Sequence, residues 1–300
     1  MLQQFNAKNA SILVHVNGGL VPRSEAKVSV FDSVVQGGDA VWEGLRVYQG
    51  KIFSLDRHLD RLFQSAHALD FKEVPSREEV VEAIFATLQA NGMKDGVHIR
   101  LTLTRGEKIT SGMDPRLNQA GCSLIVLAEW KPPVYPPSIK LITSSQRRNN
   151  PMFLDSKIHH NNLLNNILAK IEANYAGADA GIMLDKDGFV AEANGVNLFC
   201  IRGGKVFTPY AHACLPGITR GHILEICQEL SIPYAEQNLS ITEFYTADEV
   251  FTTGTMGELT KVEEIDGRRI INKSSVQRLD ELVQAFSERT AGMGTPIPGV

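Results

Sequence analysis

Cysteine is scarce in this chain, and its four copies lie far apart. Cys122, Cys200, Cys214 and Cys227 form no Cys-x-x-Cys pair within the 300 residues. Zinc knuckles and disulfide frameworks need closely spaced or paired cysteines, so the sequence indicates neither kind of site. We interpret the four as core thiols of a protein in a reducing cytoplasm.

An excess of positive charge and long apolar runs are also lacking. The net charge is −4, which argues against a general nucleic-acid or membrane-surface partner. No apolar stretch reaches the roughly 20 residues that a spanning helix needs. The first residues show no basic segment followed by an apolar one, so we expect no signal peptide and a cytoplasmic location. With 43% apolar and 21% charged residues, the composition is that of a globular protein.

The periodic segments that are present predict an α+β fold. Alternating or apolar runs typical of strands dominate the first residues, and Asn17-Gly18-Gly19 is typical of a hairpin turn. Leu55–Leu69 changes to helical spacing, and Ser76 with Glu79 forms a capping-box pattern before a second helix. The strands expected in this half cover residues 12–16, 27–31, 40–48, 52–55, 96–104 and 122–129.

A proline-rich segment divides the chain. Pro132, Pro133, Pro136 and Pro137 fall within six residues, which suits neither a helix nor a sheet interior. We therefore expect an N-terminal domain over residues 1–130, a linker over 131–138 and a C-terminal domain over 139–300. The second half predicts helices near residues 162–176, 216–230, 242–246 and 274–288, short strands between them, and a loose tail after residue 290.

One lysine, Lys157, stands out because polar but uncharged residues surround it. A lone lysine is usually a solvated surface charge. In a partly desolvated pocket beside other cations, however, a lysine amine has a lowered pKa and can form a Schiff base. His159 and His160 follow it, but adjacent side chains of an extended segment point to opposite sides. We therefore expect no metal site, and one of these histidines to be a structural hydrogen-bonding residue.

Three further segments could hold a phosphorylated aldehyde cofactor. Glu192 lies at a strand end, where a carboxylate could face a pyridine nitrogen; the alternative is an ordinary turn acid. Gly217 precedes a helix whose free N–H groups and dipole suit a phosphate, and Thr219 adds a hydroxyl. Thr253-Gly254-Thr255 offers a second polar turn. Arg61 could add charge, although each of these signals is weak alone.

Taken together, these segments resemble the class IV, fold-type IV pyridoxal-phosphate aminotransferases. That family includes branched-chain and D-amino-acid aminotransferases and aminodeoxychorismate lyases. Order and spacing match over most of the chain. The matching motifs are Ala26–Asp32, Glu43–Tyr48, His58–Leu62, Ile99-Arg100, Thr104–Gly106, Lys157, Glu192, Asn197–Phe199, Leu215–Arg220, Ala247–Phe251 and Thr253–Thr255.

The resemblance implies a fold and a set of roles. It implies a smaller N-terminal α/β domain, a larger C-terminal domain with a β-barrel-like core, and a homodimer or higher oligomer with each active site between the domains. Lys157 would hold pyridoxal 5′-phosphate as an internal aldimine and then move the substrate proton. Glu192 would pair with the pyridine nitrogen, and Leu215 would pack on the ring. The implied phosphate ligands are Arg61, Gly217, Ile218, Thr219 and Thr255.

This chain departs from the branched-chain pattern around the substrate. It has Gly37 and His98 where those enzymes usually carry tyrosines, and Trp42 where they carry phenylalanine. The tyrosine expected after the lysine is also missing, with Asn162 or Leu163 in its place. Arg100 remains as a candidate carboxylate partner. The expected substrate residues are Gly37, Trp42, Arg46, His98, Arg100, Thr255 and Met256.

The function that the resemblance implies is transamination. We expect an amino group to move between an amino acid, with branched-chain L-amino acids favoured, and a 2-oxo acid such as 2-oxoglutarate. The alternatives within the fold are a D-amino-acid or (R)-amine transaminase and an aminodeoxychorismate-lyase-like enzyme. A non-catalytic relative is a different class, but such a protein would need neither Lys157 nor Glu192.

Overall fold

The chain forms two compact units in this computed structural model, which describes residues 3–272, 274 and 276–299. The N-terminal unit contains Gln3–Pro132, the short segment Ile158–Asn162 and the residues from Thr290 onward. The C-terminal unit contains Pro133–Lys157 and the described residues of Leu163–Arg289. The prediction of separate domains joined at residues 131–138 stays a prediction, and it did not foresee the return of residues 158–162 to the N-terminal unit.

The N-terminal unit is built on an antiparallel seven-stranded sheet with the order β16-β4-β3-β5-β6-β1-β2. Its hairpin turn is formed as expected, with Asn17 and Gly18 at φ 49° and 83°, the left-handed values that such a turn requires. The strands are β1 Leu13–Val16, β2 Gly19–Pro22, β3 Ala40–Tyr48, β4 Lys51–Ile52, β5 Val97–Thr104, β6 Ser123–Trp130 and β16 Thr295–Pro296.

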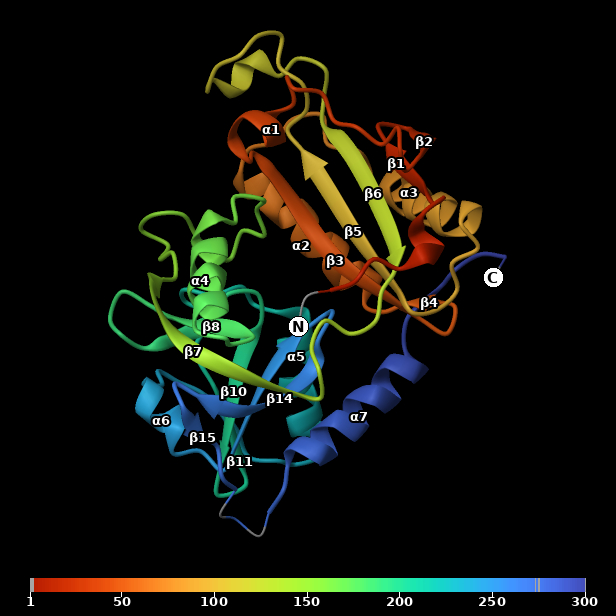
Figure 1. Cartoon of the computed structure of the whole chain (residues 1–300). Helices are drawn as coiled ribbons and strands as arrows, with labels where there is room; N and C mark the ends of the chain where they lie inside the picture. The colour runs from red at the N-terminus through yellow and green to blue at the C-terminus, as the bar shows by residue number, and fades with distance from the viewer. Residues whose placement is uncertain (1–2, 273, 275, 300) are drawn as a thin grey trace. The chain divides into compact units, whose positions relative to one another are not determined.

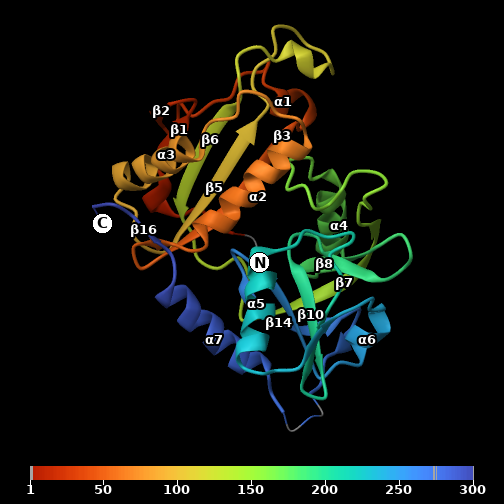
Figure 2. The same cartoon turned by 180° about the vertical axis from the view of Figure 1, so that it is seen from behind.

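Helices α2 (Leu55–Ala68) and α3 (Arg77–Ala90) cover one face of this sheet (Figure 2). Leu59 and Leu62 of α2 are fully buried, which agrees with the predicted helical spacing. Ser76 and Glu79 form the predicted capping box at the start of α3. The remaining elements are the short helix α1 (Ser33–Gly37) and the 3₁₀ turns η1 (Ala7–Asn9) and η2 (Pro115–Leu117).

The C-terminal unit is built on a mixed nine-stranded sheet that curls into a half-barrel (Figure 1). Its main order is β12-β11-β10-β13-β14-β7-β8-β9, with β15 paired to β14. The strands are β7 Ser138–Arg147, β8 Ala180–Leu184, β9 Val190–Ala193, β10 Asn197–Arg202, β11 Lys205–Thr208, β12 Tyr234–Glu236, β13 Glu249–Gly254, β14 Glu258–Ile265 and β15 Arg268–Arg269. The helices are α4 Leu164–Tyr175, α5 Ile218–Glu229, α6 Ile241–Tyr245 and α7 Leu279–Gly292. The α+β prediction is confirmed.

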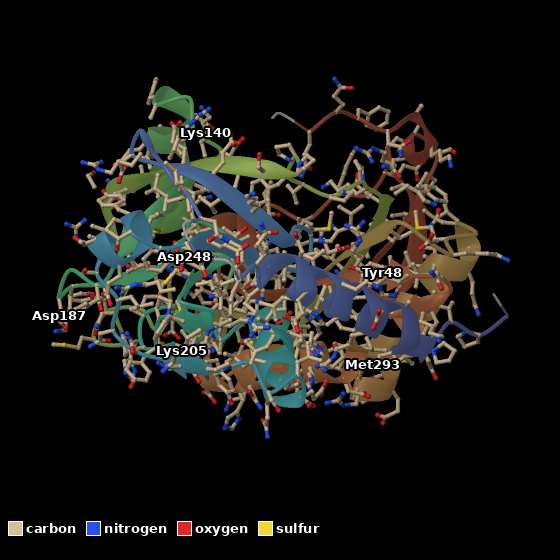
Figure 3. The ribbon with its side chains drawn as sticks, turned by 90° about the horizontal axis from the view of Figure 1, so that it is seen from below. Tyr48, Lys140, Asp187, Lys205, Asp248 and Met293 are labelled. Atoms are coloured by element: carbon tan, nitrogen blue, oxygen red, sulfur yellow. The ribbon has the colours of Figure 1, made fainter. Side chains whose placement is uncertain are left out.

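The turns of this sheet carry the exposed acids that the sequence placed there. Asp187 lies in the turn between β8 and β9, at the rim of its unit in Figure 3. Asp248, just before β13, accepts a hydrogen bond from the backbone N–H of Gly203 at 2.7 Å, which fixes the turn between β10 and β11. These acids shape turns and carry no chemistry.

Several local predictions are wrong. Lys27–Phe31 is not a strand, and the strand expected over residues 52–55 stops at Ile52, because Ser54 has a φ of 52° and Leu55 already begins α2. The tail is not loose: β16 pairs with β4, and Ile297 is only 3% exposed. The helix expected over residues 274–288 begins at Leu279, while residue 275 lies outside the described residues.

No helix in the described ranges is both long and apolar enough to cross a bilayer.

Candidate active site

A buried carboxylate, that of Glu43 on β3, organises the polar residues of the N-terminal unit. Its oxygen Oε1 accepts hydrogen bonds from Arg61 Nε at 2.7 Å and from His159 Nδ1 at 3.1 Å. Its oxygen Oε2 accepts from Arg61 Nη2 at 2.7 Å and from His58 Nδ1 at 2.7 Å. The side chain of Glu43 is 0% exposed, and these donors satisfy the lone pairs that burial would otherwise leave unpaired.

The geometry also fixes the charge of this cluster. Burial alone would raise the pKa of Glu43, but the charge interaction with His159 and the hydrogen bonds from Arg61, His159 and His58 hold its pKa well below the usual range. Burial lowers the pKa of His159 to about 4, against the opposing effect of Glu43. An ionised carboxylate only accepts hydrogen bonds, so both imidazoles carry their proton on Nδ1.

The segment that follows Lys157 pairs with the open edge of β3. The N–H of Trp42 donates to the carbonyl of His159 at 2.9 Å, and the N–H of Asn161 donates to the carbonyl of Ala40 at 2.8 Å. The N–H of His159 donates to Ser65 Oγ of α2 at 3.1 Å. As the alternation of an extended segment predicts, only one of the two adjacent histidines reaches Glu43.

The predicted substrate residues Trp42, Arg46, His98 and Arg100 share one face of the N-terminal sheet. β3 and β5 pair Arg46 with His98 and Gly44 with Arg100. The Arg100 guanidinium carbon lies 3.4 Å from the centre of the Trp42 ring, and its Nη2 donates to Asn161 Oδ1 at 3.1 Å. A Cβ at Gly44 would lie 3.2 Å from His98 Nε2, so the glycine makes room for the imidazole.

This sheet face is poor in water, and the pKa values of its bases respond. Burial, with contributions from Lys131, Arg100 and Arg46, lowers the pKa of His98 to about 3. Burial likewise lowers the pKa of Arg100 to about 10. His98 is therefore a neutral imidazole among cations, and Arg100 keeps its charge in a site where a carboxylate would compensate it.

Lys157 itself lies in a turn of the C-terminal unit. Its Nζ pairs with Asp155 Oδ1 at 2.9 Å, and its side chain is 43% exposed. The backbone N–H of Lys157 also donates to Asp155 Oδ1, at 3.0 Å. The amine is accessible to an aldehyde, and Asp155 is the carboxylate that balances its charge.

Glu192 on β9 is the buried carboxylate of the C-terminal unit. Its oxygen Oε1 accepts from Arg148 Nε at 2.6 Å, and its oxygen Oε2 accepts from Asn197 Nδ2 at 3.2 Å. The side chains of Arg148 and Glu192 are both 6% exposed. The ordinary turn-acid alternative does not fit this degree of burial.

The glycine before α5 is required by its surroundings. Asn197 Nδ2 donates to the carbonyl of Leu215 at 2.9 Å, and a Cβ at Gly217 would come within 2.1 Å of Asn197 Oδ1. Gly217 is the N-cap residue and provides no side-chain cap for the first turn, which contains Ile218 and the buried Thr219. The backbone N–H groups of that turn are therefore available to an anion.

The second predicted turn, Thr255–Gly257, connects β13 to β14. The carbonyl of Met256 accepts from the N–H of Val134 at 3.1 Å, so the proline-rich segment packs against this turn. Within the described residues, the buried hydroxyl of Thr253 has no hydrogen-bond partner. Thr253 pairs across the sheet with Asn197, which places this unsatisfied donor beside the Glu192 network.

The structure thus gathers the predicted residues into two sets. The N-terminal unit brings together Arg61, Trp42, Arg46, His98 and Arg100, whereas Gly37 is exposed at the end of α1. The C-terminal unit contains Glu192, Leu215, Gly217, Ile218, Thr219, Thr255, Met256 and Lys157.

Arg148 was not predicted from the sequence, because it is close to Glu192 only in the folded chain. Its one signal is a basic pair, Arg147-Arg148, at the end of a strand, which alone is typical of a surface. Among the described residues, no group of three or more His, Cys, Asp or Glu side chains is arranged to hold a metal ion.

Comparison with known proteins gives consistent matches. The family model of class IV amino-transferases matches residues 40–265. "Branched-chain-amino-acid aminotransferase-like protein 2" of Arabidopsis thaliana is 58% identical over 294 residues, covering 97% of this chain and 52% of that protein. A "putative branched-chain-amino-acid aminotransferase" of Methanocaldococcus jannaschii is 38% identical over 276 residues, covering 92% of this chain and 95% of that protein.

A solved structure matches over nearly the whole chain. The branched-chain amino acid aminotransferase of T.th., complexed with N-(5′-phosphopyridoxyl)-L-glutamate, superposes with a TM-score of 0.86 at 33% identity. The match covers 96% of this chain and 97% of that one. The chain spans about half the length of the first curated relatives it matches, 52% and 53%.

Proposed function

Because this chain belongs to the class IV aminotransferase family, we propose that it is a pyridoxal-phosphate-dependent transaminase. It would move an amino group between an amino acid and a 2-oxo acid. The predicted fold-type IV architecture, with two sheets of which one is a curled half-barrel, is confirmed. The observation that carries the proposal is the hydrogen-bonded path from Glu192 through Asn197 to the residues before the uncapped α5 helix.

The residues of the C-terminal unit fit the two ends of pyridoxal phosphate. The buried carboxylate of Glu192 suits a protonated pyridine nitrogen, and Arg148 and Asn197 hold that carboxylate in place. The first turn of α5, with Ile218 and Thr219, suits the phosphate. The unsatisfied hydroxyl of Thr253, in the part of the chain that the structure describes, provides a further donor.

When bound, pyridoxal phosphate supplies an aldehyde for amines and a ring that withdraws electrons from the substrate Cα. Lys157 provides the amine that binds the aldehyde, and its Nζ carries the proton that leaves and returns to the substrate Cα. Arg61 adds a positive charge for the phosphate, and Glu43 orients its guanidinium.

The favoured substrates are branched-chain L-amino acids with 2-oxoglutarate as acceptor. Support comes from the M. jannaschii relative and from the T.th. structure, whose ligand contains L-glutamate. Arg100 is the carboxylate partner in this proposal. Trp42 and His98 make the side-chain pocket differ in shape from that of a standard branched-chain enzyme. We also propose a homodimer located in the cytoplasm.

The test is the visible absorption of the purified full chain after addition of pyridoxal phosphate. A yellow band that bleaches with L-leucine or L-valine supports both the cofactor and the substrate class. Bleaching with D-alanine or an (R)-amine alone would keep the cofactor and replace the substrate proposal with the D-amino-acid alternative.

Lys157→Ala is the matched variant, because it removes the amine and leaves Glu192 and α5 unchanged. It should bind pyridoxal phosphate without the lysine-dependent band and should lose turnover. A wild-type chain that remains colourless and does not bind pyridoxal phosphate would overturn the enzyme proposal.

A further inference from the structure

We propose that His159 is a positioning residue that fastens the segment after Lys157 to the carboxylate that orients Arg61. The inference rests on the proposed function, because it gives the lysine and the arginine a shared anchor. It assigns a role to a side chain that is two residues from the lysine and belongs to none of the family motifs matched above.

His159 has two separate attachments to the N-terminal unit. Its backbone pairs with β3 through the carbonyl that accepts from Trp42, and with α2 through the N–H that donates to Ser65. Its ring lies 4.1 Å, centre to centre, from the Trp42 ring and donates to Glu43. The backbone pairing needs no particular side chain, so the ring contacts are what this histidine adds.

Glu43 divides its oxygens between the two functional segments. Oε1 accepts from Arg61 Nε and His159 Nδ1, whereas Oε2 accepts from Arg61 Nη2 and His58 Nδ1. His58 and Arg61 both come from α2, so they hold the carboxylate to one element. His159 is the donor to Glu43 that comes from the segment after the lysine.

The charges that face His159 come from each of its neighbouring elements. Glu43 on β3 attracts a proton to the ring, while Arg61 on α2 and Arg100 on β5 oppose one. His58 on α2 is buried, and its pKa is also lowered, chiefly by burial. His159 therefore acts as a neutral donor at neutral pH, and its contribution is direction and attachment.

The test uses hydrogen–deuterium exchange of the full chain without cofactor. His159→Phe keeps an aromatic ring against Trp42 and removes the donor to Glu43. Exchange in residues 157–163 and at the amide of Trp42 should become about tenfold faster or more, since a hydrogen bond to a charged group is lost. His159→Asn places an amide nitrogen where Nδ1 lies and should restore much of the protection.

His58→Phe is the matched control, because it removes an equivalent donor from Glu43 without touching the lysine segment. It should leave exchange in residues 157–163 near the wild-type rate. If His159→Phe does not fold, His159→Ser serves as the second donor-free variant, read against His159→Asn. Unchanged protection in the donor-free variant, or equal loosening in His58→Phe, would overturn the assignment.

A spectroscopic measurement on the loaded chain separates positioning from mere packing. In His159→Phe, the pH at which the visible band of the pyridoxal-phosphate-loaded protein changes should shift, and His159→Asn should move it back. A wild-type chain that takes up no pyridoxal phosphate would defeat the proposed function alone, because the exchange test needs no cofactor. A loaded chain whose band does not shift in His159→Phe would defeat the positioning role.

Discussion

At the scale of single residues, the N-terminal unit concentrates its polar chemistry on one buried carboxylate. Glu43 comes from a strand whose neighbours Val41 and Leu45 are fully buried, so an unpaired charge there would be costly. Arg61 and His58 lie on one face of α2 because they are three residues apart. The motif His58–Leu62 in the sequence therefore already implied that these two side chains point the same way.

Glu43→Gln should strongly destabilise the protein. The change leaves the Arg61 guanidinium without its ionised partner in a site that is largely closed to water. Removing one member of a buried pair typically costs about 3–5 kcal/mol of unfolding free energy. Urea unfolding measures this cost. Glu82→Gln, at an exposed position of α3, is the control and should change stability by about 0.5 kcal/mol or less.

Acid should destabilise the fold well before its carboxylates are protonated. The folded pKa values of His159, about 4, and His98, about 3, lie below the ordinary value of 6.5. The unfolded chain therefore takes up protons below pH 6.5 that the folded chain refuses, and stability falls as pH falls through that range. Each histidine should cost about 2 kcal/mol between pH 7 and pH 5.

Urea unfolding at pH 7, 6 and 5 measures this loss, and His98→Asn should flatten its pH dependence. His212→Asn, at an exposed position, is the control and should leave the dependence unchanged. Stability that stays constant between pH 7 and pH 5 would mean that these imidazoles are not buried as described.

At the scale of elements, periodicity predicted most strands and helices, and it failed where one backbone angle interrupts a run. β3 and β8 have the predicted bounds, Ala40–Tyr48 and Ala180–Leu184. The apolar run 52–55 was assigned to a single strand because the turn at Ser54, with a φ of 52°, leaves no glycine signal. The pairing of β16 with β4 joins residues that are distant in sequence, which local patterns cannot reveal.

Helix α4 shows a second limit, because its apolar stripe does not face the core. The residues that pack inward are Ala169 and Ala173, and a Cβ at Gly181 would come within 2.8 Å of the Ala169 carbonyl. The side of the helix predicted to be buried is instead exposed, by 66% at Leu164, 49% at Ile167, 47% at Leu168 and 42% at Ile171. A stripe of this kind on a helix usually marks an interface.

We expect Ile167→Glu to weaken the proposed homodimer with little effect on the fold. The side chain is half exposed within the single chain, so a charge there costs little folding energy but opposes burial against a second copy. Light scattering measures the mass, and Asn174→Glu, exposed on the same helix, is the control. Equal masses for wild type and Ile167→Glu would place the interface elsewhere or remove it.

At the scale of the whole molecule, motif order predicted more than any single residue could. The resemblance supplied the family and the α+β architecture, because it summed many weak signals over most of the chain. It did not supply the link between His159 and Glu43, which are separated by 116 positions in sequence. Arg148 was missed for the same reason, since its contact with Glu192 spans 44 positions.

Pyridoxal phosphate should stabilise the whole chain against heat. A ligand that binds the folded state alone adds about 2.7 kcal/mol when present at 100 times its dissociation constant. Differential scanning calorimetry with and without the cofactor measures the rise in Tm, and Lys157→Ala should show a smaller rise. Pyridoxine, which lacks both aldehyde and phosphate, is the control. An unchanged Tm with pyridoxal phosphate would contradict the cofactor proposal.

The pairing of residues 159–161 with the edge of β3 also limits how this part of the gene can change in length. Side chains of an extended segment alternate between faces, so one residue added or removed between Lys157 and the paired stretch would turn a different side chain toward Glu43. Insertions of two residues would preserve which face each side chain occupies. Natural variants of this segment should therefore differ from this chain in even steps, or else have lost the histidine.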